Sequence, residues 1–413
     1  YPEQSIKESW NSATAKKLRR HIINNDLSFG CQYCEYFFLS RKFTALKPQV
    51  YDKYSSFKHL DYPKVMEFEI SNTCNLECIM CNGKASSSIR KNRDKLPAQK
   101  SQYDEVFVNQ LEEFIPQLKE AKFYGGEPLL TELYFHIWDR MLRLNPSINI
   151  FFITNGTVLN DRIKNYLFKG NFDIAVSFDS VVKEKFEAIR KNACYNEVVN
   201  NIHFFNDYCK TRKKVLSLSF TTMKSNWDEM PGVINFCNEL GAQIFVSYLK
   251  TPEHLAIWNL PQETLQSMQE KLANFSFPDI TDEEKVNKLC FIDYLNHLKY
   301  WQQKNRDLKY NYTNNKSSML ISNEDLKLSI LNQIKIHIDN SDKYPDKEVS
   351  CNFICGKLKK IIIQLTKDCD ENLILKTLNQ TSVEIIVTEL ENNNEEEIIK
   401  KALDYLGNNI VNT

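Results

Sequence analysis

The sequence predicts an α/β fold in which a partial (β/α)6 barrel follows a Cys-containing helical segment and precedes a small α/β domain. Two observations predict the barrel. From residue 64 onward, short apolar runs alternate with longer amphipathic stretches, which is typical of βαβ units and a parallel sheet. Six such units are present, fewer than the eight of a closed TIM barrel, so we expect a partial, TIM-like barrel.

Strands and helices of the barrel are expected to alternate, with two helices in succession before the fifth strand. The strand-like runs are 65–71, 121–124, 149–154, 173–178, 215–221 and 243–248. The helical patterns are 103–117, 131–144, 160–168, 182–191, 195–211 and 227–240. In parallel barrels the active site lies at the carboxyl ends of the strands, and the polar motifs between residues 74 and 180 all follow or end a strand. We therefore expect one site at that end.

Four parts are predicted along the chain. Residues 1–62 hold an amphipathic helix over 7–29 and a first cysteine pair, and residues 63–255 form the barrel. Residues 256–316 are a helical extension or linker, in which 309–316 is polar and turn-like. Residues 317–413 are expected to form the small α/β domain, because they contain apolar runs at 360–365 and 383–387.

Charge and hydropathy exclude several classes of function. The 53 basic and 53 acidic residues give no net charge, so nucleic acid is not an expected partner. No apolar run of the length that a membrane span needs and no secretory signal are visible, which predicts a cytoplasmic protein with no membrane partner. The sequence opens on Tyr1 rather than Met, which leaves open that residues precede it in the full-length protein.

Seven of the twelve cysteines stand in three short motifs. Cys31 and Cys34 form a CxxC pair, and Cys351 and Cys355 form a CxxxC pair. The third motif, CxxxCxxC, contains Cys74, Cys78 and Cys81. Local clustering in a long chain without a secretory signal indicates metal ligands rather than disulfides.

Three thiolates on one loop suit an open iron–sulfur cluster. Cys74, Cys78 and Cys81 follow directly after a strand-like run. A [4Fe–4S] cluster normally takes four cysteines, so three leave one iron open. The amino and carboxylate groups of S-adenosylmethionine (AdoMet) can chelate that iron. Two alternatives remain: three core cysteines on one helix face, or a zinc site, which usually has four ligands.

The CxxxCxxC motif after the first barrel strand resembles the signature of the radical SAM superfamily. A second match is Tyr124-Gly125-Gly126-Glu127-Pro128, after the second strand, which is similar to the GGEP motif of that family. The resemblance implies that Gly125, Gly126, Glu127 and Pro128 bind the AdoMet amino group. Without the resemblance, the same residues would suit an ordinary strand-to-helix turn.

Further residues match the family in order and place. Thr154-Asn155-Gly156 follows the third strand, although an Asn-Gly turn is the simpler interpretation. The resemblance implies that Ser177 and Asp179 contact the AdoMet ribose and that Arg190 pairs with its carboxylate. It also implies that Met80 packs near the adenine of AdoMet and that Asn226 contacts AdoMet.

Residues 1–34 resemble the end of an auxiliary-cluster domain of the SPASM or twitch type. The resemblance lies in the stretch WNS, then LRR, then the pair Cys31 and Cys34, and it implies a second iron–sulfur cluster. Two ligands are too few for such a cluster. The others would precede Tyr1 or be Cys351 and Cys355, although those two also suit a buried helix face. Cys31 and Cys34 would equally suit half a zinc site or a redox pair.

The resemblance implies a function. A [4Fe–4S] cluster would cleave AdoMet reductively to a 5′-deoxyadenosyl radical, which takes a hydrogen atom from the substrate. We favour a peptide or protein substrate. The alternatives are a small molecule, such as a nucleotide, sugar or cofactor precursor, and a non-catalytic iron–sulfur protein with a redox or binding role. The enzyme would need an electron donor such as flavodoxin or ferredoxin.

Overall fold

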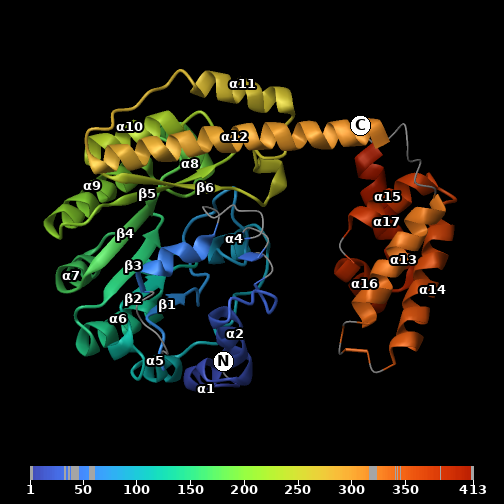
Figure 1. The fold of residues 1–413 in the computed structure, drawn as a ribbon, viewed down its shortest axis with the longest axis horizontal. Coiled ribbons are helices and arrows are strands. Elements are labelled where there is room, and N and C mark those ends of the chain that lie inside the picture. The colour runs from blue at the N-terminus through green and yellow to red at the C-terminus, as the bar shows by residue number, and fades with distance from the viewer. Residues whose placement is uncertain are drawn as a thin grey trace. The chain divides into compact units, whose positions relative to one another are not determined.

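The computed structural model describes residues 3–31, 34–35, 38, 46–54, 61–315, 323–339, 341, 343–344, 346–381 and 383–410. The chain divides into two compact units, Tyr1–Arg306 and Asp307–Thr413, each of which is described by itself (Figure 1).

One parallel sheet organises the first unit. Its strands are β1 (Val65–Phe68), β2 (Glu120–Phe123), β3 (Asn149–Thr154), β4 (Phe172–Ser177), β5 (Ser217–Thr222) and β6 (Gln243–Tyr248). They lie in the order β1-β2-β3-β4-β5-β6, and every neighbouring pair is parallel. Each strand falls within two or three residues of the expected position, which confirms the α/β partial barrel.

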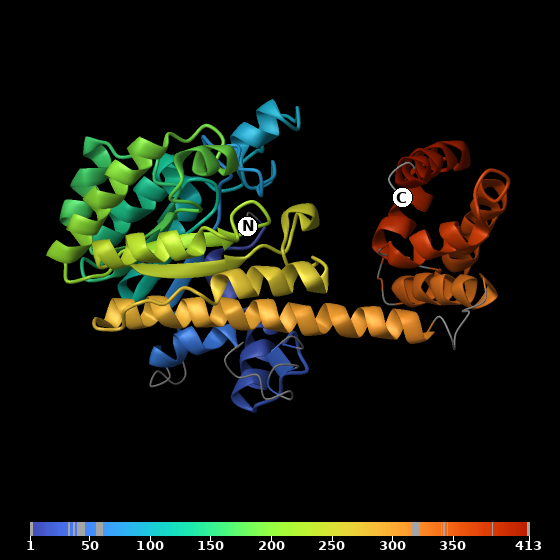
Figure 2. The same ribbon diagram turned by 90° about the horizontal axis from the view of Figure 1, so that it is seen from above.

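Helices connect consecutive strands, as the alternation of the sequence predicts. The crossovers contain α4 (Ser87–Asn92), α5 (Glu105–Leu111), η3 (Ile115–Gln117), η4 (Pro128–Leu130), α6 (Glu132–Leu144), α7 (Asp161–Lys169), α8 (Lys183–Ile189), α9 (Tyr195–Thr211) and α10 (Met230–Leu240). After β6 follow η5 (Glu253–Leu255), α11 (Gln262–Leu272) and α12 (Asp282–Asn315). Gln302 of α12 donates a hydrogen bond to the carbonyl of Leu265, so α11 and α12 lie side by side, as both views show (Figure 2).

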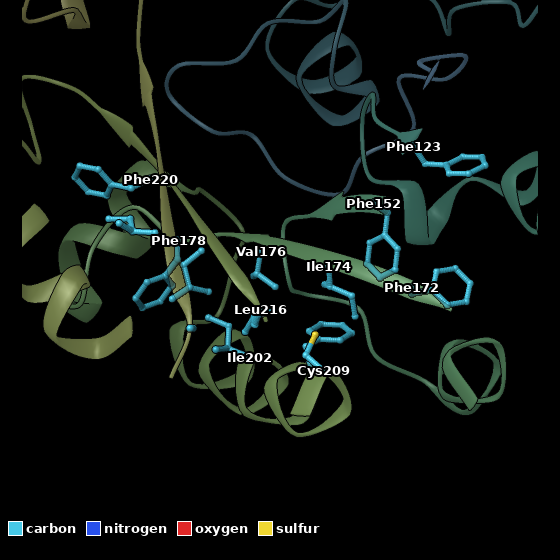
Figure 3. Packing of buried hydrophobic residues seen from close by; sticks show 14 of the residues in the cluster. Phe123, Phe152, Phe172, Ile174, Val176, Phe178, Ile202, Cys209, Leu216 and Phe220 are labelled. Carbon is cyan, nitrogen blue, oxygen red and sulfur yellow. The ribbon is translucent and has the colours of Figure 1, made fainter. Parts of the chain in front are cut away.

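The helix-facing side of the sheet is the core of this unit. Alternate residues of each strand point to the same side, and Phe123, Phe152 and Ile174 are register partners on neighbouring strands. All three are buried (Figure 3). Trp138 of α6 packs on them, with ring centroids 5.5 Å from Phe123 and 5.9 Å from Phe152. Burial of these aromatic side chains fixes the register of the strands.

The opposite side of the sheet is polar and partly open. Glu67, Lys122 and Phe151 are register partners there, and Glu67 is exposed. The 3-10 helix η2 (Lys47–Tyr54) contacts this side, because the hydroxyl of Tyr51 donates to Glu67 and accepts from Lys122. The two sides of the sheet therefore differ in chemistry.

The N-terminal helical segment is two helices rather than one. The sequence predicts a single helix over 7–29, but the structure has α1 (Ile6–Trp10) and α2 (Ala13–Ile23). The break comes at Ser12, whose side chain accepts a hydrogen bond from the N–H of Ala15 and so starts a new helix.

The second unit is helical throughout the residues that the structure describes, so the expected small α/β domain is wrong. Its helices are α13 (Asn323–Asp339), α14 (Lys347–Leu365), α15 (Glu371–Gln380), α16 (Val383–Asn392) and α17 (Glu395–Ile410). The apolar runs 360–365 and 383–387 lie in α14 and α16. Short apolar runs suit a buried helix as well as a strand, and these helices bury theirs in a separate core.

The turn expected at 309–316 is also wrong over 309–315, which continue α12. This stretch is polar but contains neither glycine nor proline, so nothing in it stops a helix. Among the described residues, no helix has the length and apolar character needed to cross a membrane.

Candidate functional site

The three cysteines of the CxxxCxxC motif lie on one loop after β1. The N–H of Cys81 donates to the carbonyl of Cys78 at 3.0 Å, which closes a turn between the last two. The N–H of Ile79 donates to the carbonyl of Ile189 at 2.9 Å. The cysteine loop is therefore tied to the C-terminal end of α8.

Two serines at the start of α4 hold the same loop. The hydroxyl of Ser87 accepts from the N–H of Cys74 at 3.0 Å and lies 3.1 Å from its carbonyl. The hydroxyl of Ser86 donates to the carbonyl of Leu76 at 2.7 Å and caps α4. The sequence analysis missed both residues, although a serine before an apolar helical residue is a recognisable N-cap.

The three thiols lie close enough to influence one another. Burial raises the pKa of each, that of Cys78 to about 11, and the neighbouring sulfurs Cys74 and Cys81 contribute to the rise at Cys78. In the described part of the chain, no three His, Cys, Asp or Glu side chains surround a point that one metal ion would occupy, as zinc requires. Ligands of a four-iron cluster bind separate irons and do not need to meet at one point.

The Gly125-Gly126 turn contacts the chain that leads into the cysteine loop. Gly125 and Gly126 have φ angles of +81° and +52°, which side chains rarely adopt. A Cβ atom on Gly126 would lie 2.3 Å from the carbonyl oxygen of Thr73. The N–H of Glu127 donates to that oxygen at 2.6 Å. Glycine is therefore required here for close backbone contact beside the cysteines.

The carboxylate of Glu127 joins this turn to the end of β3. It is fully buried and accepts hydrogen bonds from the hydroxyl of Thr154 at 2.7 Å and the N–H of Leu129 at 3.1 Å on Oε1. Oε2 accepts from the N–H of Asn155 at 2.7 Å. Burial raises the pKa of Glu127 to about 7. A contact with the AdoMet amino group would use the remaining acceptor capacity of Oε2.

Asn155 contacts the cysteine loop directly. Its side-chain nitrogen donates to Oδ1 of Asn75 at 3.0 Å and lies 3.9 Å from Sγ of Cys74. Its Oδ1 accepts from Thr157, which fixes the orientation of the amide. The motif after β3 therefore lies directly beside the first cysteine.

The end of β4 brings a buried ion pair to the same loop. Nη2 of Arg190 lies 2.7 Å from Oδ2 of Asp179, and Nη1 lies 4.0 Å from Sγ of Cys78. Oδ1 of Asp179 accepts from the N–H of Thr221 at 2.8 Å. Ser177, two residues earlier at the end of the strand, is half-buried.

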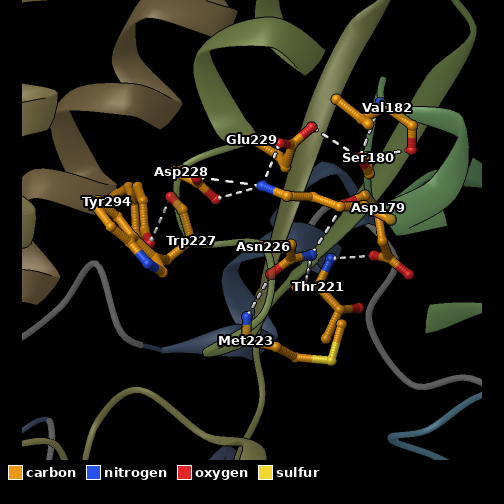
Figure 4. A network of polar contacts seen from close by, with 11 residues as sticks. Asp179, Ser180, Val182, Thr221, Met223, Asn226, Trp227, Asp228, Glu229 and Tyr294 are labelled. Atoms are coloured by element: carbon orange, nitrogen blue, oxygen red, sulfur yellow. Dashed lines mark hydrogen bonds and ion pairs between the residues drawn. The ribbon is translucent and has the colours of Figure 1, made fainter. Parts of the chain in front are cut away.

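Asn226 lies in a buried network that joins the ends of β4 and β5 (Figure 4). Its side-chain nitrogen donates to the carbonyls of Asp179 at 2.9 Å and Thr221 at 3.0 Å. Its Oδ1 accepts from the N–H of Met223 at 2.7 Å. Asn226 therefore positions these loops, while its expected contact with AdoMet stays a prediction, as does that of the half-buried Met80.

A cavity of about 460 Å³ opens beside the glycine turn. Its walls are residues 69–73, which lead into the cysteine loop, together with 84–85, 99–103 and Gly125–Gly126. Pockets of this size usually hold small ligands.

The N-terminal pair lies outside this set of contacts. Cys31 and Cys34 are half-buried, and the described residues show no bond from either side chain to the cysteine loop. The motif before them is structural: Arg19 stacks on the ring of Trp10 at 4.3 Å and donates to its carbonyl. In the second unit, the sulfurs of Cys351 and Cys355 lie 3.8 Å apart on α14, as expected for one helix face.

The site fits an open cluster with a chelating ligand. The three-cysteine loop, a turn that only glycine permits and a buried guanidinium all meet at one end of the sheet. Nε of Arg190 is buried and has no hydrogen-bond partner among the described residues, as expected where a polar group is missing.

The comparison with protein families agrees with this geometry. Residues 68–237 match the model of the radical SAM superfamily. Over these residues the chain is therefore similar to that superfamily. The matched residues run from the end of β1 into α10, and the [4Fe–4S] cluster and AdoMet expected from the sequence are the cofactors typical of that superfamily.

Known relatives match only part of the chain. A probable GTP 3′,8-cyclase of Methanocaldococcus jannaschii is 26% identical over 195 residues, covering 46% of this chain and 60% of that protein. A GTP 3′,8-cyclase of Aquifex aeolicus is 27% identical over 192 residues, covering 45% and 57%. The chain therefore spans little more than half the length of these relatives.

Solved structures resemble the chain distantly. Streptococcus suis SuiB bound to S-adenosylmethionine has 16% identity and a TM-score of 0.39, covering 61% of this chain and 59% of that chain. The enzyme anSMEcpe with bound AdoMet has 18% identity and a TM-score of 0.37, covering 50% and 58%. Likeness at this level does not bear on the reaction.

Proposed function

We propose that the chain is a radical SAM enzyme that abstracts a hydrogen atom from its substrate. When bound, the cluster and AdoMet supply a one-electron cleavage that gives methionine and a 5′-deoxyadenosyl radical. The observation that supports this most strongly is the convergence of the cysteine loop, the Gly125-Gly126 turn and Asn155 at one end of the sheet. An electron donor of the flavodoxin or ferredoxin type would complete the system.

Each group of residues has a role in this proposal. Cys74, Cys78 and Cys81 would hold the cluster and leave one iron open. The loops after β2 to β5 would bind AdoMet, with Met80 beside the adenine and Arg190 at the carboxylate. The other contacts would come from Gly125 to Pro128, Thr154, Asn155, Ser177, Asp179 and Asn226. The protein's part is to orient the cofactor and exclude water, since the cofactor carries the chemistry.

The test is formation of 5′-deoxyadenosine. Reconstituted, dithionite-reduced protein should convert AdoMet to 5′-deoxyadenosine without substrate, and Cys78→Ala should reduce this to background. Cys194→Ala is the matched control, because Cys194 is exposed and outside the loop. A wild-type protein that binds a cluster but forms no 5′-deoxyadenosine would leave the non-catalytic iron–sulfur alternative in place.

Two substrate classes follow from different observations. The SPASM-like or twitch-like tract that ends at Cys31 and Cys34 supports a peptide or protein substrate. The relatives named GTP 3′,8-cyclase and the cavity of about 460 Å³ support a small molecule, such as a nucleotide. The stimulation of 5′-deoxyadenosine formation by nucleoside triphosphates or by peptide libraries separates the two classes.

An auxiliary cluster on Cys31 and Cys34 is proposed on the same tract. The triple variant Cys74→Ala, Cys78→Ala and Cys81→Ala removes the ligands of the first cluster. If the auxiliary cluster exists, this variant keeps iron and acid-labile sulfide, and adding Cys31→Ala and Cys34→Ala removes both. A triple variant without iron would disprove the auxiliary cluster and leave the radical SAM function untouched.

A further inference from the structure

Arg190 places a permanent positive charge beside the buried cysteine of the loop. It follows α8 directly, its side chain is only 8% exposed, and its Nη1 lies 4.0 Å from Sγ of Cys78. Cys78 is the most buried of the three cysteines. Guanidinium groups do not lose their proton in proteins, so this charge is present at every relevant pH.

Asp179 balances that charge on the other side. Its carboxylate has no exposed surface, lies 2.7 Å from Nη2 of Arg190 and accepts a hydrogen bond from the N–H of Thr221 at 2.8 Å. A buried ion pair often adds little to the stability of the fold. The free energy needed to remove both charges from water can exceed the free energy gained from their attraction. Its position beside Cys78 therefore needs another reason.

The backbone holds this arrangement in place. The N–H groups of Glu77 and Ile79 donate to the carbonyls of Lys191 and Ile189 at 3.0 and 2.9 Å. These two bonds flank Cys78 on one side and Arg190 on the other. The segments that carry Cys78 and Arg190 are thus held side by side, and the ion pair with Asp179 holds the guanidinium in place.

We propose that Arg190 and Asp179 set the reduction potential of the cluster through their charges beside Cys78. This inference rests on the proposed function, and it makes Arg190 a tuning and positioning residue rather than only a ligand of the AdoMet carboxylate. Reduction adds one negative charge to the cluster. A nearby buried positive charge favours that state and a buried negative charge opposes it, with little screening by water.

The test is a reductive titration with dithionite, in the absence of AdoMet, followed by electron paramagnetic resonance of the reduced cluster. Arg190→Gln should shift the midpoint to a more negative potential, because one positive charge is lost. Asp179→Asn should shift it in the opposite direction. Arg190→Lys keeps the charge and should stay near the wild-type value.

Arg93→Gln is the matched control for charge. Arg93 donates to the carbonyl of Cys81 at 2.8 Å, but its side chain is 46% exposed, so water screens it. We expect a clearly smaller shift than for Arg190→Gln. If the two residues had a purely structural role, Arg190→Gln and Asp179→Asn would shift the midpoint potential in the same direction.

The outcomes separate the two proposals. A wild-type protein that binds no [4Fe–4S] cluster overturns the proposed function and this inference with it. A cluster whose potential is the same in wild type, Arg190→Gln and Asp179→Asn overturns the inference alone, even if AdoMet affinity falls in Arg190→Gln. If Arg190→Gln fails to hold a cluster, the direction of the shift in Asp179→Asn decides the matter.

Discussion

Gly126 and Gly241 both have left-handed backbone angles, with φ of +52° and +66°, but their surroundings differ. A Cβ atom on Gly126 would lie 2.3 Å from the carbonyl oxygen of Thr73, whereas one on Gly241 would meet no atom within 4 Å. The pair therefore separates the effect of backbone conformation from that of close contact.

We predict that Gly241→Ala costs about 1–2 kcal/mol of unfolding free energy, the cost of a left-handed alanine. Gly126→Ala should cost more, because the Thr73 segment must also move, and it should reduce the iron retained after reconstitution. Chemical denaturation and iron analysis measure the two effects. Equal losses in the two variants would contradict the role of close contact at Gly126.

Glu127 predicts a pH dependence of stability. Burial raises its pKa from the usual 4.5 to about 7, so between these values the folded protein holds more protons than the unfolded chain. Its contribution to stability is therefore complete below about pH 4.5 and is lost as the pH rises towards 7. Urea denaturation of the metal-free protein across this range should show the decline, and Glu127→Gln should flatten it.

Glu132 serves as the control for that experiment. Arg162 holds the pKa of Glu132 below its usual value, so its small contribution is lost as the pH falls. Glu132→Gln should leave the decline between pH 4.5 and 7 unchanged. If the stability of Glu127→Gln still declined over this pH range, another titrating group would be responsible for the decline.

At the level of residues, the sequence could predict ligands but not their neighbours. Two short motifs identify the site, namely the spacing of Cys74, Cys78 and Cys81 and the Gly-Gly pair. They can be recognised because the residues of each motif are close together in the sequence. The partner of Arg190 could not be identified in this way, because Asp179 reaches it only through the fold. Asn226 shows the same limit, since its burial between β4 and β5 depends on strand pairing.

At the level of elements, the first turn of α4 stabilises the cysteine loop. The hydroxyl of Ser86 is buried, accepts from the N–H of Ile89 and donates to the carbonyl of Leu76. Ser86→Ala should cost about 1–2 kcal/mol, as the loss of a helix cap does, and should lower iron retention. Ser88→Ala, within the same turn, is the control, and equal effects of both variants on iron content would contradict the prediction.

Strands and helices of the barrel were predictable, and those of the second unit were not. The strands β1 to β6 alternate with helices along the chain, and that order alone indicates a parallel sheet. Ile361, Ile362 and Ile386 sit in runs that are equally apolar, but they are buried between helices. Composition does not distinguish a buried strand from the buried stripe of a helix when the run is short.

For the whole molecule, the two units have separate cores, so their stabilities should be separable. Leu375 of α15 is fully buried in the second core, and Leu375→Ala should cost that unit about 2–5 kcal/mol. Differential scanning calorimetry should show one transition lowered and the other unchanged. Leu373→Ala on the same helix is the control, because Leu373 is partly exposed. A uniform shift of all unfolding would show that the units unfold as one.

The contrast between the two sides of the sheet has a consequence for how such a protein diversifies. Phe152 and its register partners hold the strands together, so exchanges there threaten folding. On the opposite, polar side of the sheet, Glu67 and Phe245 are exposed and contribute little to the core. Exchanges of those two side chains should therefore cost less stability than exchanges around Phe152, so this side of the sheet can vary while the scaffold beneath it stays as it is.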